Sequence, residues 1–314
     1  MANNKSRILI IRNDRIGDMV LTLSAITALR KEYPQSRLYL LCSKSNREVA
    51  QLLPFDIDLI EDRGFKANIK KLKNLELDIG IDFVNNWRGT NAVQMFLSKI
   101  KKRAGFYGLL NRAFLNTGLK AKKDVSLLKQ SFMLLKKLGI NRIERYRQEL
   151  NIPDTDIKVD IVVHPGGYYP SQKWPVEYYI NLMEKIKNKT NKSFCVIGVT
   201  GEKDIIGKIR EKFSNQIYLI DEPIKKIAAV MKKAELFIGN NSGPLHLASM
   251  IGIKTVSFIG PTNPDVFYPQ GENDYVFREE LDCIGCGRGE CGHHSCMKEI
   301  TPDKVWEKIR KLIL

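Results

Sequence analysis

Several features that place a protein in a familiar class are missing from this 314-residue sequence. No apolar run approaches the ~20 residues that a membrane-spanning helix needs. The sequence has no low-complexity segment, no short-period repeat, no GxxxxGK[ST] phosphate loop and no GxSxG nucleophile motif. Strand-like sequence begins within the first eight residues, which leaves no room for a signal peptide. We therefore expect a cytoplasmic protein that neither spans a membrane nor hydrolyses nucleotides.

Acidic residues are scarce relative to basic ones. The chain has 35 Asp and Glu against 51 Lys and Arg, for a formal net charge of +16. Such a charge attracts anionic partners, namely nucleic acid, anionic lipid or phosphorylated substrates. The basic residues are spread through helix-like segments such as 65–73 and 185–192 and are not gathered in a tail. The solvated face of a helix is the simpler interpretation of any single basic run.

Cysteines are few outside one short segment. Cys42 and Cys195 lie in apolar, strand-like runs and are expected to be small buried residues. The other four are Cys283, Cys286, Cys291 and Cys296. In a cytoplasmic protein this cluster favours metal or redox chemistry over disulfides, and its thiols are candidate ligands of structural Zn or Fe, with His293 and His294 as alternates. The cluster lacks a second CxxC pair, so a reduced loop without metal is the alternative.

Short apolar runs alternate with amphipathic helical stretches along almost the whole chain. This alternation predicts an α/β fold with parallel, doubly wound sheets that helices cover on both faces. The expected strands read, in chain order, RILIIR, RLYLLC, FDIDLIE, LDIGIDF, RAGFYG, DIVVHP, SFCVIGV, QIYLID, ELFIGN and TVSFIGP. A long helix is expected after Asp18, and others cover 126–138, 176–189, 204–213, 224–233 and 302–314.

The pattern restarts in the middle of the chain, after a polar stretch over 151–158. We expect two Rossmann-like domains, one over 1–152 and the other over 153–314. The helix over 302–314 is a candidate to pack back on the first domain. Ligands of open α/β sheets bind at the C-terminal ends of the strands, so two such sheets are expected to face a central cleft.

The first of three polar loops follows the strand over 7–12. It contains Arg12 and Arg15, Gly17 permits a sharp turn, and Asp18 stands at the start of a helix. Aspartate is a favoured N-cap residue, and losing a cap costs about 1 kcal/mol. Capping alone therefore explains Asp18, and the alternative is that its carboxylate faces a substrate.

The second loop carries glycines and a lysine. Gly166 and Gly167 follow a strand and let the backbone approach a ligand closely. Lys173 precedes Trp174 and Pro175, and this rigid pair would hold the lysine in place. Lys173 is either an exposed loop residue or a point charge for a diphosphate.

The third loop leads into an apolar helix. Asn241, Ser242 and Gly243 precede the helix, and His246 lies one turn inside it. Backbone N–H groups at such a helix start form an anion site. A lone histidine on an apolar helix is more often a core residue, although His246 lies close to this site. None of the three loops carries GxGxxG, so hydride transfer has no support.

Four segments together have a family's motifs in the family's order. They are Ile16–Leu23 (IGDMVLTL), His164–Gly166 with Lys173–Pro175, Asn241–Ala248 (NSGPLHLA) and Gly260–Thr262 (GPT). On these residues the chain resembles the family 9 glycosyltransferases, the ADP-heptose:lipopolysaccharide heptosyltransferases and their relatives. One segment alone would be unspecific, but the likeness extends over nearly the whole length.

The resemblance implies a GT-B architecture, with the acceptor on the first domain and the nucleotide sugar on the second. It also implies inverting transfer that requires no cofactor for catalysis. Asp18 would be the general base that removes a proton from the acceptor hydroxyl group. Arg12 and Arg15 would guide an anionic acceptor towards it.

The resemblance also assigns the donor site. Lys173 and the turn at Ser242 would hold the donor diphosphate, and Glu202 would contact the nucleoside ribose. The full set of donor residues is Gly166, Lys173, Glu202, Asn241, Ser242, Gly243 and His246. Many relatives carry aspartate at the position of Asn241, so a negative charge is missing beside the expected diphosphate.

The expected reaction is the transfer of heptose from ADP-heptose to an anionic glycolipid, the phosphorylated inner core of lipopolysaccharide or a related glycan. It would take place with peripheral attachment to the inner face of the cytoplasmic membrane. The alternatives are another nucleotide sugar or a protein acceptor within the same family, and a sugar-nucleotide epimerase. A basic nucleic-acid-binding protein is the alternative from another class, although no nucleic acid partner is expected.

Overall fold

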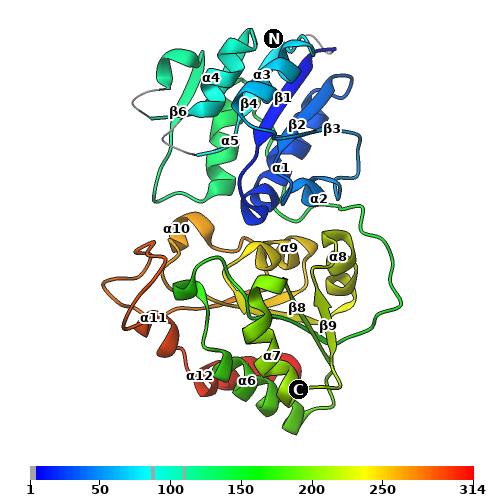
Figure 1. The fold of residues 1–314 in the computed structure, drawn as a ribbon, viewed down its shortest axis with the longest axis vertical. Coiled ribbons are helices and arrows are strands. Elements are labelled where there is room, and N and C mark those ends of the chain that lie inside the picture. The colour runs from blue at the N-terminus through cyan, green and yellow to red at the C-terminus, as the bar shows by residue number, and fades with distance from the viewer. Residues whose placement is uncertain (1–4, 86–88, 109–110) are drawn as a thin grey trace. The chain divides into compact units, whose positions relative to one another are not determined.

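Two compact units make up the structure, a computed structural model that describes residues 5–85, 89–108 and 111–314. The units are Met1–Asn151 and Ile152–Leu314. Strands alternate with helices in both units (Figure 1). The α/β fold class with doubly wound parallel sheets, expected from the sequence, is confirmed.

The first unit is built on a parallel six-stranded sheet with the strand order β3-β2-β1-β4-β5-β6. In the central strand β1, Ile10 pairs with Leu40 of β2 and with Ile81 of β4. Residues 8–11 of β1 are fully buried, as expected for a strand covered on both faces. The strands are β1 (Arg7–Arg12), β2 (Arg37–Cys42), β3 (Asp58–Glu61), β4 (Ile79–Asp82), β5 (Lys102–Tyr107) and β6 (Thr117–Lys120).

The helices of the first unit are α1 (Ile16–Glu32), α2 (Arg47–Ala50), α3 (Phe65–Lys73), α4 (Thr90–Leu97), η1 (Arg112–Phe114) and α5 (Leu127–Lys137). Helix α1 is buried from Met19 to Leu29 and packs against β1, α2 and α5. This packing fixes the first turn of α1 beside the end of β1. Among the helices of the described residues, none is long and apolar enough to cross a bilayer.

The second unit repeats the same plan. Its parallel sheet has the order β12-β11-β10-β7-β8-β9, so each sheet runs 3-2-1-4-5-6 when strands are numbered within their own unit. The strands are β7 (Ile161–His164), β8 (Phe194–Gly198), β9 (Ile217–Ile220), β10 (Leu236–Asn240), β11 (Lys254–Phe258) and β12 (Asp274–Phe277).

The helices of the second unit are η2 (Pro170–Gln172), α6 (Val176–Lys189), η3 (Thr200–Glu202), α7 (Lys203–Lys212), α8 (Ile224–Lys233), α9 (Gly243–Ile251), α10 (Pro264–Phe267), α11 (Ser295–Lys298) and α12 (Pro302–Ile313). The sequence makes α12 a candidate to pack on the first domain. In the structure α12 packs on α6, and Val305 and Ile309 join the core of the second unit, because its apolar face is buried there.

Each sheet has one point where the strand order reverses, between β1 and β4 in the first unit and between β7 and β10 in the second. The strands at these switch points end in polar residues: Arg12 and Asp82 in the first unit, His164 and Asn240 in the second. Ligands of doubly wound folds bind at such points. The two switch points are therefore where functional groups are expected.

Candidate active site

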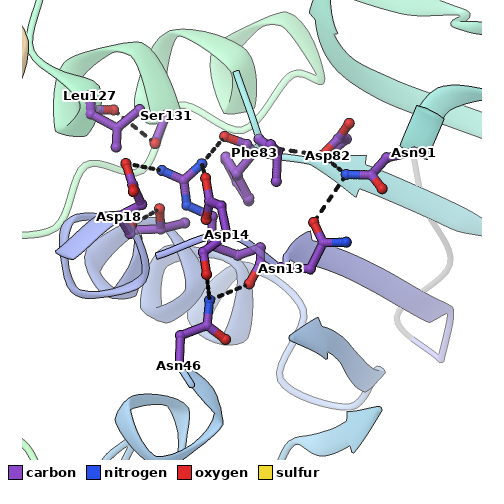
Figure 2. A network of polar contacts seen from close by, with 12 residues as sticks. Asn13, Asp14, Asp18, Asn46, Asp82, Phe83, Asn91, Leu127 and Ser131 are labelled. Atoms are coloured by element: carbon purple, nitrogen blue, oxygen red, sulfur yellow. Dashed lines mark hydrogen bonds and ion pairs between the residues drawn. The ribbon is translucent and has the colours of Figure 1, made fainter. Parts of the chain in front are cut away.

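A buried arginine holds the loop between β1 and α1. Arg12 is 1% exposed. Its Nη1 atom donates to the carbonyl of Phe83 and pairs with Asp14 Oδ2 at 3.3 Å, and its Nη2 atom pairs with Asp18 Oδ1 at 3.5 Å (Figure 2). Both terminal nitrogens are used inside the protein. Arg12 is therefore an internal counter-charge for two carboxylates, and not the acceptor-facing group that the sequence predicts.

Asp18 lies in the first turn of α1 but does not cap the helix. The helix begins at Ile16, the N-cap position is the exposed Arg15, and no side chain makes a capping bond there. The carboxylate of Asp18 is 16% exposed and pairs with Arg12. The capping interpretation is therefore wrong, while the helix dipole still stabilises a negative charge in this turn.

Asp14 places a second carboxylate on the same guanidinium group. Its side chain is 29% exposed, and its Oδ1 atom is buried without a hydrogen-bond partner among the described residues. Burial is the main reason that the pKa of Asp14 is raised to about 6, while Arg12 lowers that pKa and Asp18 raises it further. Ser43 Oγ and Asn46 Nδ2 donate to the backbone carbonyl of Asp14 at 3.0 and 3.3 Å and fix the loop.

Asp82, at the end of β4, is a third carboxylate that the sequence does not single out. It is 3% exposed and accepts hydrogen bonds from Val84 N at 3.0 Å and Asn91 Nδ2 at 3.1 Å (Figure 2). Burial raises the pKa of Asp82 to about 7, although these hydrogen bonds and Arg12 lower it. An aspartate at the end of an apolar strand was the available signal, but the sequence does not show that β4 lies beside β1.

In the second unit, Asn240 ties the loop after β10 to the loop after β7. This residue is fully buried at the end of β10. Its Nδ2 atom donates to the carbonyls of Pro165 and Gly166 at 2.9 and 2.8 Å, and its Oδ1 atom accepts from Trp174 N at 2.9 Å. The sequence singles out the neighbouring Asn241 instead. Asn240 therefore sets the geometry of both predicted donor loops, although it was not predicted to do so.

His164, at the end of β7, connects two predicted donor residues. Its Nδ1 atom lies 3.1 Å from Ser242 Oγ, and its Nε2 atom lies 3.7 Å from Glu202 Oε2. Glu202 also accepts hydrogen bonds from Gly167 N at 3.0 Å and Val199 N at 3.1 Å. Burial raises the pKa of Glu202, but His164 and these N–H groups outweigh burial and lower that pKa overall. The ribose contact expected of Glu202 stays a prediction, since the structure gives this carboxylate internal partners.

The carboxylate of Glu202 also lies against the backbone of Gly166. A Cβ atom at Gly166 would lie 1.8 Å from Glu202 Oε1, closer than any real contact. The sequence predicts that a glycine here lets the backbone approach a ligand. In the structure, the group that approaches the backbone is Glu202.

The N-terminus of α9 has no side-chain cap. Ser242 occupies the N-cap position, but its hydroxyl group contacts His164 and makes no capping bond to the helix. The backbone N–H groups of the first turn, which begins at Gly243, are therefore left for an anion. Lys173 follows η2 directly, its side chain lies beside Gly167, and within the described part of the chain it forms no ion pair. Both features suit the predicted diphosphate site.

Two other predicted donor residues are buried. His246 is 3% exposed, and burial lowers its pKa to about 4, so the ring is neutral at neutral pH. Any support that His246 gives to a phosphate therefore comes from an uncharged ring. Asn241 Nδ2 donates to the carbonyl of Phe267 at 3.0 Å. An aspartate has no donor for this bond, which gives the asparagine a structural reason to be here.

The predicted metal site at the cysteine-rich segment is not supported. In residues 5–85, 89–108 and 111–314, no three His, Cys, Asp or Glu side chains are grouped so that they could hold an ion. Structural Zn or Fe at Cys283, Cys286, Cys291 and Cys296 is therefore not supported. The thiols differ in exposure, since Cys296 is buried in the core and Cys286 is exposed. Burial, and after it the nearby Cys283, Cys291 and Cys286, raise the pKa of Cys296 to about 11.

The same segment instead braces the loop that precedes Lys173. Ser171 Oγ donates to the carbonyl of Arg288 at 2.6 Å, and Ser171 N donates to the carbonyl of Gly289 at 3.2 Å. His294 Nε2 lies 2.9 Å from the carbonyl oxygen of Ser171. The structural role of the segment is thus to fix η2.

The chain is similar over nearly its whole length to known heptosyltransferases. It is 24% identical to lipooligosaccharide heptosyltransferase 2 of Campylobacter jejuni, a match that covers 95% of this chain and 96% of the relative. The solved structure of E. coli ADP-heptose lipopolysaccharide heptosyltransferase II matches with a TM-score of 0.80 at 18% identity and covers 98% of each chain. E. coli heptosyltransferase WaaC with ADP matches with a TM-score of 0.76 at 18% identity, covering 98% of this chain and 99% of that one. These likenesses show that the fold is GT-B.

One family profile also matches the chain. The profile described as glycosyltransferase family 9 (heptosyltransferase) matches residues 66–296. This range holds the donor-side motifs, from Gly166 to His246, whereas Asp18 lies outside it. The resemblance seen in the four sequence motifs is thus confirmed, and the chain belongs to glycosyltransferase family 9.

Proposed function

We propose that the enzyme transfers heptose from ADP-heptose to the inner core of lipopolysaccharide or a related anionic glycan, with inversion and without a catalytic metal. The printed names of the relatives support the donor and the acceptor class. One contrast between the two switch points carries the proposal. At the switch point of the first unit, carboxylates gather around Arg12. Near the switch point of the second unit lie a helix N-terminus without a side-chain cap and a lysine, Lys173, that forms no ion pair with any described residue.

The first unit binds the acceptor. Asp18 takes the proton of the attacking hydroxyl group, and the freed oxygen forms a bond to the anomeric carbon of the donor. Arg15, the exposed N-cap residue of α1, meets the anionic groups of the acceptor. Arg12 holds Asp18 in place from inside the protein.

The second unit binds the donor. As the new bond forms, the bond from the anomeric carbon to the diphosphate breaks, and ADP leaves with the electron pair. Lys173 and the backbone N–H groups at the start of α9 stabilise the negative charge on the departing diphosphate. His164 holds the hydroxyl group of Ser242 away from these N–H groups, which keeps them open.

Donor identity is tested by thermal unfolding with a panel of nucleotide sugars. A donor that binds the native state raises its apparent stability, by about 2.7 kcal/mol at 100 times Kd. We expect ADP-heptose to raise the Tm more than ADP-glucose or UDP-N-acetylglucosamine does. Transfer to truncated inner-core lipopolysaccharide is then followed by mass spectrometry, and a larger effect of another donor, or transfer to protein alone, would contradict the assignment.

The acceptor places the reaction at the inner face of the cytoplasmic membrane. The net charge of +16 supports this location, because anionic lipids attract basic surfaces. Sedimentation with vesicles of phosphatidylglycerol and phosphatidylcholine, compared with vesicles of phosphatidylcholine alone, measures this attraction. Binding to both vesicle types alike, or tighter binding to RNA at moderate salt, would count against it.

A further inference from the structure

Asp14 and Asp18 lie on the two terminal nitrogens of one buried guanidinium group (Figure 2). Arg12 Nη1 is 3.3 Å from Asp14 Oδ2, and Nη2 is 3.5 Å from Asp18 Oδ1. Because the guanidinium fork is planar and rigid, it holds the two carboxyl groups in a fixed relation. One positive charge thus faces two carboxylates, and Asp82 adds a third acidic group within electrostatic reach of Asp14.

The two carboxyl groups on Arg12 are not equivalent. Asp18 lies in the first turn of α1, where the helix dipole stabilises its negative charge and so makes it a reluctant proton acceptor. Asp14 lies in the loop before the helix, and its Oδ1 atom is buried without a hydrogen-bond partner among the described residues. A buried carboxylate oxygen that receives no hydrogen bond is costly to keep ionised, so Asp14 binds a proton more readily than an ordinary aspartate does.

We propose that Asp14 and Asp18 act as one coupled pair on Arg12, in which Asp18 accepts the proton of the acceptor hydroxyl group and the charge on Asp14 sets how firmly Arg12 holds the carboxylate of Asp18. This inference rests on the transfer reaction proposed above. The O–H bond of the acceptor breaks as a bond to Asp18 forms, and Asp18 releases the proton to water after the product leaves. While Asp14 is ionised, it shares the charge of Arg12 with Asp18 and leaves Asp18 a stronger base. Once Asp14 is protonated, the charge of Arg12 acts on Asp18 alone. Asp14 acts through Asp18 and is therefore a positioning residue.

The charges around Asp14 fit this role. Arg12 from β1 and Arg15 from the loop lower the pKa of Asp14, whereas burial and the carboxylate of Asp18 raise it. The balance is a pKa of about 6, not far below neutral pH, so the charge of Asp14 changes in a range that can affect catalysis. The charge on Asp18 raises the pKa of Asp14, so the two carboxyl groups titrate as a coupled pair.

The first test needs no substrate. Aspartate carboxyl ¹³C signals are titrated by NMR in the whole protein and in Asp14→Asn, Asp18→Asn and Asp58→Asn variants. We expect one signal with a pKa near 6 that is absent in Asp14→Asn, moves down by about one pH unit in Asp18→Asn, and is unchanged in Asp58→Asn, since Asp58 pairs with Arg37 at the surface. An Asp14 signal at the ordinary value of about 4, or one that Asp18→Asn does not move, would overturn the proposal.

The second test uses ADP-heptose and truncated inner-core lipopolysaccharide. In Asp14→Asn we expect kcat to fall about 3- to 30-fold and the acidic limb of the kcat profile to move to lower pH, with Asp14→Glu restoring the limb. An acidic limb in Asp14→Asn that coincides with that of the unmodified enzyme would refute the pair. Turnover retained by Asp18→Asn would instead refute the base role of Asp18, so the two failures are distinguishable.

Discussion

The two units of this enzyme have the same strand order and opposite electrostatics. At the switch point of the first unit, buried acids surround one arginine, and the pKa values of Asp14 and Asp82 are raised. At the switch point of the second unit, the one acid that the structure gives a role, Glu202, is held by His164 and two backbone N–H groups, and its pKa is lowered. The first arrangement favours taking up a proton, and the second favours keeping a negative charge fixed.

This difference shows how one fold can serve two halves of a reaction. The sheet topology fixes where the strands end, and the residues that end them decide the chemistry. Arg12 and Asp82 make an environment for a base, whereas His164 and Asn240 make a rigid frame for backbone donors. Each prediction below changes one unit and leaves the other as its reference.

The largest effect is expected for Asp18→Asn. The variant keeps the shape of the side chain but cannot accept the acceptor proton, so kcat should fall by about 10²- to 10⁴-fold. ADP-heptose affinity, measured by calorimetry, should change less than about twofold, because the proposed donor groups lie in the second unit. A large loss of donor affinity would show that the division between the units is wrong.

The next effect is a loss of stability in Arg12→Met. Removing the guanidinium leaves buried carboxylates without their counter-charge, which costs about 3–5 kcal/mol. The loss should be largest above pH ~7 and should shrink in mild acid, where Asp14 and Asp82 are protonated. Hydrogen exchange read by mass spectrometry reports each unit separately. Equal loosening of both units, or a loss that does not depend on pH, would contradict this account.

A smaller loss is expected for Asn240→Ala in the second unit. The change removes three buried hydrogen bonds and leaves two carbonyls and one N–H group unpaired, which costs about 2–4 kcal/mol. Because these bonds position Gly166 and Trp174, ADP-heptose affinity should also fall by about 10-fold. Asn181→Ala, an exposed residue on α6, is the matched control and should change neither quantity.

The smallest expected effect is a difference in how the stability of each unit depends on pH. The folded pKa of Asp82 is about 7 against 3.8 in the unfolded chain, so the folded state binds more protons between these values, and the first unit loses stability as pH rises from about 4 to 7. Asp82→Asn should reduce the loss of stability between pH 4 and 7 by about 1–3 kcal/mol. The pKa of Glu202 is lowered below 4.5, so its contribution to the second unit is present above pH 4.5 and is lost as the pH falls further. Unit-resolved hydrogen exchange from pH ~3 to ~8 measures both slopes, and slopes of the same sign would contradict the comparison.

The sequence predicts much of the fold because the central strands and long helices carry strong local patterns. The helices over 176–189 and 224–233 have the observed bounds of α6 and α8. Two edge strands, β6 and β12, are not predicted. Their residues are only partly buried, and without an apolar run a strand at the edge of a sheet leaves no clear signal.

The site was predictable where one loop carries the chemistry and unpredictable where strands distant in sequence meet. Asp18 and Ser242 are marked by their local motifs. Asp82 and Asn240 act on residues up to 75 positions away, and only the register of the sheet brings them there. The same reason explains the error for Arg12, because its partner Phe83 lies 71 positions further along the chain. Local sequence shows that an arginine is present, but not that it is enclosed.

The missing cap of α9 has a consequence for how the donor binds. A helix whose first turn lacks acceptors for its N–H groups frays easily, and a bound phosphate supplies those acceptors. The diphosphate would thus complete the hydrogen bonding of the first turn of α9, so that donor binding and the ordering of this turn are coupled. After transfer, ADP still carries the groups that hold the turn together, and its release must undo this order.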